Sequence, residues 1–145
     1  MIFEKLEQVF GYKQFRPLQE EIIRRTISGK DSLVLMPTGG GKSMCFQIPA
    51  LCLNGITIVV SPLISLMKDQ VQALLSNGVK ASFFNSSLSP FEEQTVIQEA
   101  LNGTTKILYL SPEKLIAVKD TWLRDLTISL VAIDEAHCVS QWGHD

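Results

Sequence analysis

The chain alternates short apolar runs, rich in β-branched residues, with longer amphipathic stretches. Nearly continuous apolar runs are typical of strands that are covered on both faces of a sheet. Five such runs predict strands at Ser32–Met36, Thr57–Val60, Ala81–Phe84, Ile107–Leu110 and Leu130–Ile133. The amphipathic stretches predict helices at Ile2–Phe10, Pro17–Ser28, Lys42–Leu53, Leu63–Asn77, Pro90–Leu101 and, with a weaker pattern, Lys119–Leu126. Repeated strand–helix–strand units indicate an α/β domain with a mostly parallel sheet, helices on both faces, and a ligand site at the carboxyl ends of the strands.

Turn and cap residues mark several of the helix ends. Ser89 can cap the helix that begins at Pro90, because proline suits the first helical position and Glu92 completes a capping box. Asn77-Gly78 and Asn102-Gly103 are typical helix-ending pairs.

Composition narrows the class of protein. With 145 residues, 46% of them hydrophobic and 19% charged, the chain can bury a substantial core. Its 13 basic and 15 acidic side chains give a net charge of −2, which excludes a nucleic-acid binder that works by bulk positive charge. Any nucleic acid would have to be held by local geometry.

The cysteines and the chain's apolar stretches bear on its compartment. Three cysteines with no C-x-x-C pair argue against a disulfide framework or a zinc site and favour a reducing compartment. Acidic residues interrupt the apolar N-terminus, which excludes a signal peptide, and no apolar stretch is long enough to span a bilayer. We expect a soluble intracellular domain with no membrane partner.

A glycine-rich turn follows the first predicted strand. It reads Met36, Pro37, Thr38, Gly39, Gly40, Gly41, Lys42, Ser43. Such a turn directs backbone N–H groups at phosphates, a lysine reaches the terminal phosphates, and a serine hydroxyl offers a ligand to Mg²⁺. Met36 replaces the first glycine of the usual G-x-x-x-x-G-K-[ST] pattern, so a plain strand–helix turn with a solvated lysine is the alternative. The strand before it and the helix after it favour binding of a nucleoside triphosphate.

Acidic residues directly follow the last predicted strand, at Asp134 and Glu135. Asp134 at a strand's carboxyl end can hold Mg²⁺, and Glu135 can orient or deprotonate an attacking water. The alternative for this pair alone is a solvated turn. His137 can couple the γ-phosphate to a neighbouring surface or be purely structural, and we expect Cys138 to be a small buried apolar residue.

Five segments together resemble RecQ-family DNA helicases. They are F-G-Y-x-x-F-R-P-L-Q at 10–19, MPTGGGKS at 36–43, SPLISLMKDQ at 61–70, LSPE at 110–113 and DEAHCVSQWGHD at 134–145. The resemblance covers essentially the whole chain. It implies a RecA-like P-loop fold and an ATP-driven motor that moves 3′ to 5′ on one DNA strand and unwinds duplex DNA in repair and recombination.

In the family the first of these segments holds the adenine. The resemblance therefore implies that Tyr12 and Arg16 stack on the base and that Gln19 reads its edge. A ring and a guanidinium plane can sandwich a purine, and an amide offers both a donor and an acceptor. The alternative is that the aromatic residues are only core contacts of a helical cap, which we expect for Phe10 and Phe15.

The resemblance also implies contacts with DNA. Hydroxyl and N–H groups of Ser61-Pro62-Leu63 and of Ser111-Pro112-Glu113, each between a strand and a helical segment, can grip phosphates without a basic surface. Lys68 and Gln70 can assist or be solvated helix residues. Trp142 can stack on single-stranded DNA and link DNA binding to hydrolysis, or pack on the surface near a frayed terminus. We expect Trp122 to be a packing residue.

The resemblance sets the expected organisation. Residues 1–30 are expected to form a helical adenine-recognition segment, and residues 31–145 an incomplete first RecA-like lobe. The second lobe, with its arginine finger, would belong to the same longer chain, so we expect this N-terminal fragment to hydrolyse ATP very slowly. The expected location is bacterial cytoplasm, or the nucleus in a eukaryote. A self-contained P-loop NTPase or kinase and a nucleotide-gated interaction module are the alternative functions.

Overall fold

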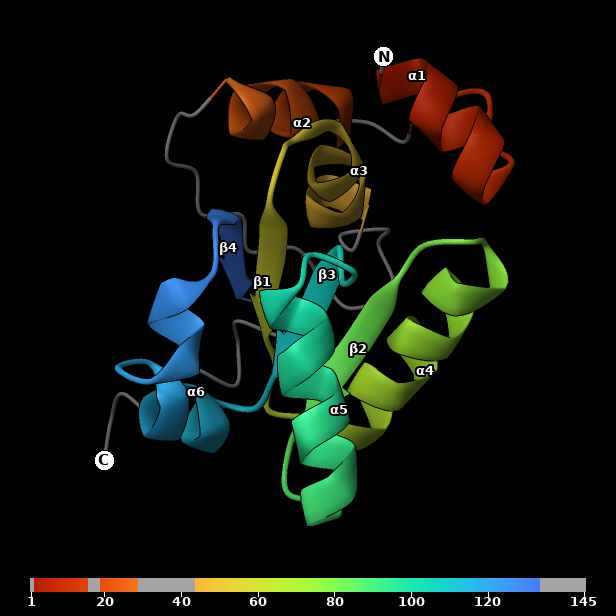
Figure 1. Ribbon diagram of the computed structural model, residues 1–145. Coiled ribbons are helices and arrows are strands. Elements are labelled where there is room, and N and C mark those ends of the chain that lie inside the picture. The colour runs from red at the N-terminus through yellow and green to blue at the C-terminus, as the bar shows by residue number, and fades with distance from the viewer. Residues whose placement is uncertain (1, 16–18, 29–43, 134–145) are drawn as a thin grey trace, which may run out of the picture. The chain divides into compact units, whose positions relative to one another are not determined.

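The structure, a computed structural model, describes residues 2–15, 19–28 and 44–133. The described residues fall into two compact units that divide between Asn54 and Gly55. Figure 1 shows the helices of the first unit and the sheet of the second. Each unit is described by itself below.

The first unit is helical. It contains α1 (Ile2–Lys5), the wider π-type turn η1 (Leu6–Phe10), α2 (Gln19–Ile27) and α3 (Met44–Cys52). Its buried core is formed by Ile2, Leu6, Ile23 and Ile48, with Phe10, Phe15, Ile27 and Cys52 packed against it. The expected core role of Phe10 and Phe15 is therefore confirmed. Burial also raises the pKa of the Cys45 thiol to about 11, so this thiol is protonated at neutral pH.

In the part of the chain that the structure describes, the second unit is built on a parallel sheet of four strands. These are β1 (Ile56–Val60), β2 (Ala81–Phe84), β3 (Ile107–Leu110) and β4 (Ile128–Ile133), in the order β2-β3-β1-β4. All three strand pairings are parallel, as predicted. Every residue of β1 and β3 is buried, which explains why these runs are continuously apolar. The predicted strand Ser32–Met36 lies outside the described residues.

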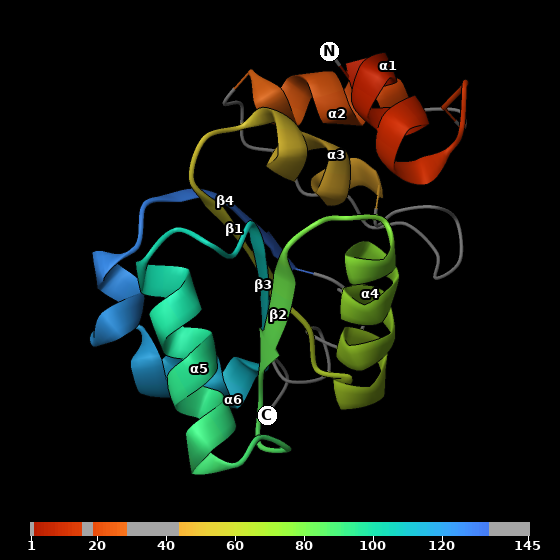
Figure 2. The same ribbon diagram turned by 45° about the vertical axis from the view of Figure 1, so that its right-hand side comes forward.

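Helices cover both faces of this sheet, as Figure 2 shows: α4 (Ile64–Ser76) lies on one face, and α5 (Pro90–Leu101) and α6 (Pro112–Val118) on the other. The core on the α5 side joins β-strand residues with Val96 and Ala100 of α5 and Leu123. Trp122 packs against this core, and its ring meets the Phe84 ring edge-on with centroids 5.3 Å apart. The prediction that Trp122 is a packing residue is confirmed.

The cap residues behave as predicted in α5. Its N-cap Ser89 and Glu92 form the reciprocal capping box, with Pro90 in the first turn. Asn77 and Asn102 are the C-caps of α4 and α5, and the glycine after each has a positive φ. The longest described helix, α4, has 13 residues. None of the helices in the described ranges is long and apolar enough to cross a membrane.

The helix predicted at Lys119–Leu126 is wrong in its extent. Instead, α6 ends at Val118, and only a 3₁₀ turn, η2 (Trp122–Asp125), follows. Thr121 separates the two because its backbone, at φ −113° and ψ −125°, is not helical. The helical segment that Ser111-Pro112 was expected to introduce is α6 itself.

A glycine fixes the start of β1. Gly55 has φ +95°, and a Cβ built on it would lie 2.5 Å from the backbone oxygen of Thr127. The backbones before β1 and β4 therefore approach too closely for any side chain at this position.

Candidate functional site

Polar residues follow three neighbouring strands at the carboxyl edge of the sheet. Ser111 comes directly after β3, Ser61 after β1, and Asn85 after β2. The Ser61 N–H donates to the Leu110 carbonyl at 3.0 Å, and the Ser111 N–H donates to the Phe84 carbonyl at 3.3 Å. The sheet ladder thus continues one residue beyond the strands and sets the predicted Ser61 and Ser111 turns side by side. This edge is where parallel α/β sheets bind ligands.

Ser111 caps helix α6. Its Oγ accepts a hydrogen bond from the Lys114 N–H at 3.3 Å, and Pro112 occupies the first turn. The Ser111 side chain is buried, at 3% exposure. Its oxygen therefore satisfies a helix N–H group. Pro112 is partly exposed and Glu113 is exposed.

The Ser61-Pro62-Leu63 turn is built differently. Ser61 is also buried, and its Oγ accepts a hydrogen bond from the Leu63 N–H at 3.3 Å. The helix begins at Ile64, so its N-cap is Leu63, which makes no side-chain cap. Leu63 and Ile64 are 42% and 38% exposed. The N-terminus of α4 therefore lies open at the edge, where its dipole favours an anion.

Gln70 and Lys68, further along α4, have different surroundings. The Tyr109 hydroxyl, buried on β3, donates to Gln70 Oε1 at 2.5 Å. Gln70 therefore holds α4 against the sheet. Lys68, two residues closer to the start of the helix, is exposed.

Asn85 is a polar residue of this edge that the sequence reasoning did not single out. It is fully buried, and its Oδ1 accepts from the Ser87 N–H at 2.9 Å and from the Ser87 hydroxyl. Its Nδ2 donates to the Met67 sulfur of α4 at 3.4 Å. The signal that could have found it is the Asn85-Ser86-Ser87 run immediately after a buried strand, because side-chain caps gather at such turns.

The structure describes two of the three residues expected to contact adenine, Tyr12 and Gln19. Tyr12 lies exposed at 59%, just after Gly11 ends η1 with φ +78°. Gln19 is the first residue of α2 and is buried at 3% exposure. An exposed ring is available for stacking.

The remaining predicted site residues lie outside the described residues. They are Arg16, Met36, Pro37, Thr38, Gly39, Gly40, Gly41, Lys42, Ser43, Asp134, Glu135, His137 and Trp142. The described part of α3 begins at Met44, next to Ser43, and the described part of β4 ends at Ile133, next to Asp134.

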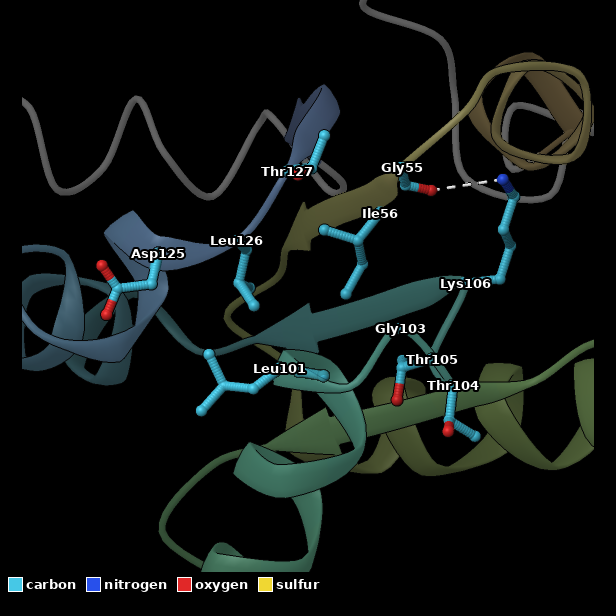
Figure 3. Close-up of a pocket in the computed structure, with 11 residues that line it drawn as sticks. Gly55, Ile56, Leu101, Gly103, Thr104, Thr105, Lys106, Asp125, Leu126 and Thr127 are labelled. Carbon is cyan, nitrogen blue, oxygen red and sulfur yellow. Dashed lines mark hydrogen bonds between the residues drawn. The ribbon is translucent and has the colours of Figure 1, made fainter.

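A pocket of about 340 Å³ lies at the opposite, amino edge of the sheet (Figure 3). It is formed where β1, β3 and β4 begin, and the Lys106 ammonium beside it donates to the Gly55 carbonyl at 3.2 Å. Its lining residues are Gly55, Ile56, Ala100, Leu101, Gly103, Thr104, Thr105, Lys106, Asp125, Leu126 and Thr127. Because ligands of parallel sheets bind at the carboxyl ends, we do not assign the candidate site to this pocket.

Comparison with known proteins gives consistent matches. The family model described as DEAD/DEAH box helicase matches residues 16–145. The chain is 57% identical over 141 residues to an ATP-dependent DNA helicase RecQ of Pasteurella multocida, with 97% of this chain and 22% of the relative covered. It is 49% identical to the ATP-dependent DNA helicase RecQ of Bacillus subtilis, with 97% and 24% covered. It is 43% identical to the ATP-dependent helicase SGS1 of Saccharomyces cerevisiae, with 99% and 11% covered. The chain thus spans less than a quarter of the length of these curated relatives.

Proposed function

Because the chain belongs to the DEAD/DEAH box helicase family, we propose that it is the N-terminal ATP-binding lobe of an ATP-dependent DNA helicase. In this proposal the helicase moves 3′ to 5′ on single-stranded DNA, unwinds duplex DNA, and acts in repair and recombination. Residues 1–30 recognise adenine, residues 31–145 form the first RecA-like lobe, and a second lobe of the same longer chain completes the ATP site. The protein acts on chromosomal DNA, in the bacterial cytoplasm or a eukaryotic nucleus.

The chemistry of the donor set fits ATP with Mg²⁺. The backbone of residues 36–41 and the Lys42 amine suit the phosphates, and the Ser43 hydroxyl and the Asp134 carboxylate are hard oxygen ligands of the kind that Mg²⁺ takes. A helix, α3, follows the glycine-rich segment in the sequence, and a strand, β4, precedes Asp134, which supports this assignment. Bound Mg²⁺ would neutralise charge on the transferred phosphoryl group.

Other residues are assigned to the nucleotide and to coupling. We assign Glu135 to the attacking water, His137 to coupling the γ-phosphate to neighbouring segments, and Trp142 to sensing single-stranded DNA. Tyr12 and Arg16 would stack on adenine, and Gln19 would read its edge. The exposed ring of Tyr12 supports this role. Gln19 would have to turn its buried amide toward the base.

DNA phosphates would be held at the carboxyl edge of the sheet. The open N-terminus of α4 at Leu63 and the turn at Ser111-Pro112 lie next to each other there. Backbone N–H groups bind phosphates without basic side chains, which agrees with a net charge of −2.

The observation that carries the proposal is the parallel order β2-β3-β1-β4. It brings the Ser61 and Ser111 turns to one sheet edge, and β4, which precedes Asp134-Glu135 in the sequence, is a strand of the same sheet. Two of the five motifs, at 61–70 and 110–113, therefore begin at this edge, which supports the proposal.

The proposal is tested by Lys42→Ala in the full-length protein. Loss of the phosphate-binding amine should lower DNA-stimulated ATP hydrolysis on the order of 10²-fold or more, while single-stranded DNA binding stays within twofold of wild type. The measurements are steady-state ATPase with saturating DNA and fluorescence anisotropy with labelled DNA.

The matched control is Lys80→Ala, which removes an exposed lysine that precedes β2. It should leave both quantities unchanged. Hydrolysis that persists at the wild-type rate in Lys42→Ala would overturn the phosphate assignment.

A further inference from the structure

Lys114 lies in the first turn of α6, where its side chain reaches two other elements. Its Nζ lies 2.9 Å from Glu93 Oε2 in α5, and 5.3 Å from the centroid of the Phe84 ring at the end of β2. Both charged side chains are mostly buried, at 29% and 28% exposure. Lys114 therefore connects α6 to α5 and to β2, and its partner Glu93 lies 21 residues earlier in the sequence.

A lysine in the first turn of a helix is disfavoured by the helix dipole, which is positive at that end. At this position the Lys114 ammonium forms a salt bridge with the Glu93 carboxylate and lies over the face of the Phe84 ring. Both interactions offset the unfavourable effect of the dipole. A second lysine in this region shows the contrast. Lys119 and Asp120 are 3.7 Å apart, and both are strongly exposed, at 59% and 80%. A pair of that kind contributes little.

The contacts of Lys114 close a ring around the turn after β3. The Phe84 carbonyl accepts from the Ser111 N–H, the Ser111 Oγ accepts from the Lys114 N–H, and the Lys114 ammonium lies over the Phe84 ring. The backbone and the side chain of Lys114 thus both act on the position of Ser111. Phe84 is itself buried and in edge contact with Trp122, so it is a fixed support.

We infer that Lys114 is a positioning residue: by binding Glu93 and Phe84 it fixes the Ser111-Pro112 turn in the orientation that holds a DNA phosphate. This inference rests on the proposed function, since it concerns the proposed DNA contact. Lys114 acts through the turn and does not itself touch DNA.

The test compares Lys114→Met, which keeps the apolar stem but removes the charge, with the exchanged pair Glu93→Lys with Lys114→Glu. Lys114→Met should raise the KM for single-stranded DNA in the ATPase assay roughly five- to tenfold, with kcat at saturating DNA within twofold of wild type. The exchanged pair restores the link between α5 and α6, and it should bring the KM back to within about threefold of wild type. Hydrogen exchange of the Leu115 amide, measured without DNA, should speed up in Lys114→Met and recover in the exchanged pair.

Lys119→Met is the matched control and should change neither readout. If Lys114 instead binds a phosphate directly, the KM for single-stranded DNA will not recover in the exchanged pair. Glu93→Gln will then strengthen DNA binding and steepen its salt dependence by about one charge. These results would overturn the inference. If DNA stimulates hydrolysis by the wild type, an unchanged KM in Lys114→Met also overturns the inference. Absence of stimulation in the wild type itself would instead contradict the proposed function, and the inference with it.

Discussion

Helices α4 and α5 begin at the same edge of one sheet, but their N-termini are capped differently. In α5 the Ser89 Oγ accepts from the Glu92 N–H at 3.2 Å, and Glu92 Oε1 accepts from the Ser89 N–H at 2.8 Å. In α4 the N-cap is Leu63, which has no side-chain acceptor to offer. Helix α6 is intermediate, with a single cap from Ser111.

This difference separates structural helix starts from one that can serve a ligand. The first N–H groups of any helix lack partners within the helix. In α5 side chains satisfy two donors at this point, whereas in α4 the Ser61 Oγ accepts from the Leu63 N–H and the N-cap residue itself offers no acceptor. An uncapped start that is also exposed is a site where an anion gains most, and α4 is therefore the better candidate for a phosphate contact.

The strongest test of this comparison introduces a side-chain N-cap into α4. Leu63→Asp should stabilise the protein by about 0.5–1 kcal/mol, because the carboxylate accepts from the first N–H groups and suits the dipole. The same change should weaken single-stranded DNA binding about tenfold, because a fixed negative charge occupies the phosphate position. Urea unfolding and fluorescence anisotropy measure the two effects.

Leu63→Asn separates capping from charge in this experiment. It should stabilise the helix comparably but weaken DNA binding less than the aspartate does. An unchanged DNA affinity in Leu63→Asp would remove α4 from the proposed contact.

Removing the existing caps should give the next largest effect. Ser89→Ala and Ser111→Ala should each lower the free energy of unfolding by about 1 kcal/mol, because each leaves a helix N–H without its acceptor. Leu63→Ala should change it by less than about 0.5 kcal/mol, since Leu63 is partly exposed and caps nothing. Equal losses in all three variants, measured by urea unfolding, would show that the three helix starts do not differ as described.

The smallest expected effect concerns pH. The Ser89 N–H, and then the Ser89 hydroxyl side chain, lower the pKa of Glu92 from its ordinary value of 4.5. The charged capping box therefore stabilises the fold at neutral pH, and this contribution is lost as the pH falls below 4.5 through the lowered pKa. Glu92→Gln should reduce the loss of stability on acidification, as measured by urea unfolding at several pH values. An identical pH dependence in wild type and Glu92→Gln would contradict the assignment.

The parallel sheet was predictable because buried strands are continuously apolar. The runs Ala81–Phe84 and Ile107–Leu110 match β2 and β3 residue for residue, and the Ser89 cap was readable because its partner Glu92 is three residues away. The start of α4 was placed one residue early, since Leu63 is its N-cap.

Contacts between distant residues were not predictable from the pattern. The bond between Tyr109 and Gln70 joins residues 39 apart, and that between Lys114 and Glu93 joins residues 21 apart. Only the packing of α4, α5 and α6 on the sheet decides which polar side chains on those helices face inward. The sequence alone therefore leaves Gln70 open between two roles and does not single out Lys114. The proposed roles at 36–43 and 134–137 remain predictions.

Gly55 shows how a residue with no chemistry of its own can be indispensable. Its positive φ and the 2.5 Å approach of the Thr127 oxygen to a would-be Cβ leave no room for even a methyl group. In a saturation library selected for folded protein, only glycine would survive at this position, although it lies at the opposite edge of the sheet from Ser61 and Ser111. Intolerance to replacement at such a site would reflect backbone clearance and would be a poor guide to where the protein binds its ligands.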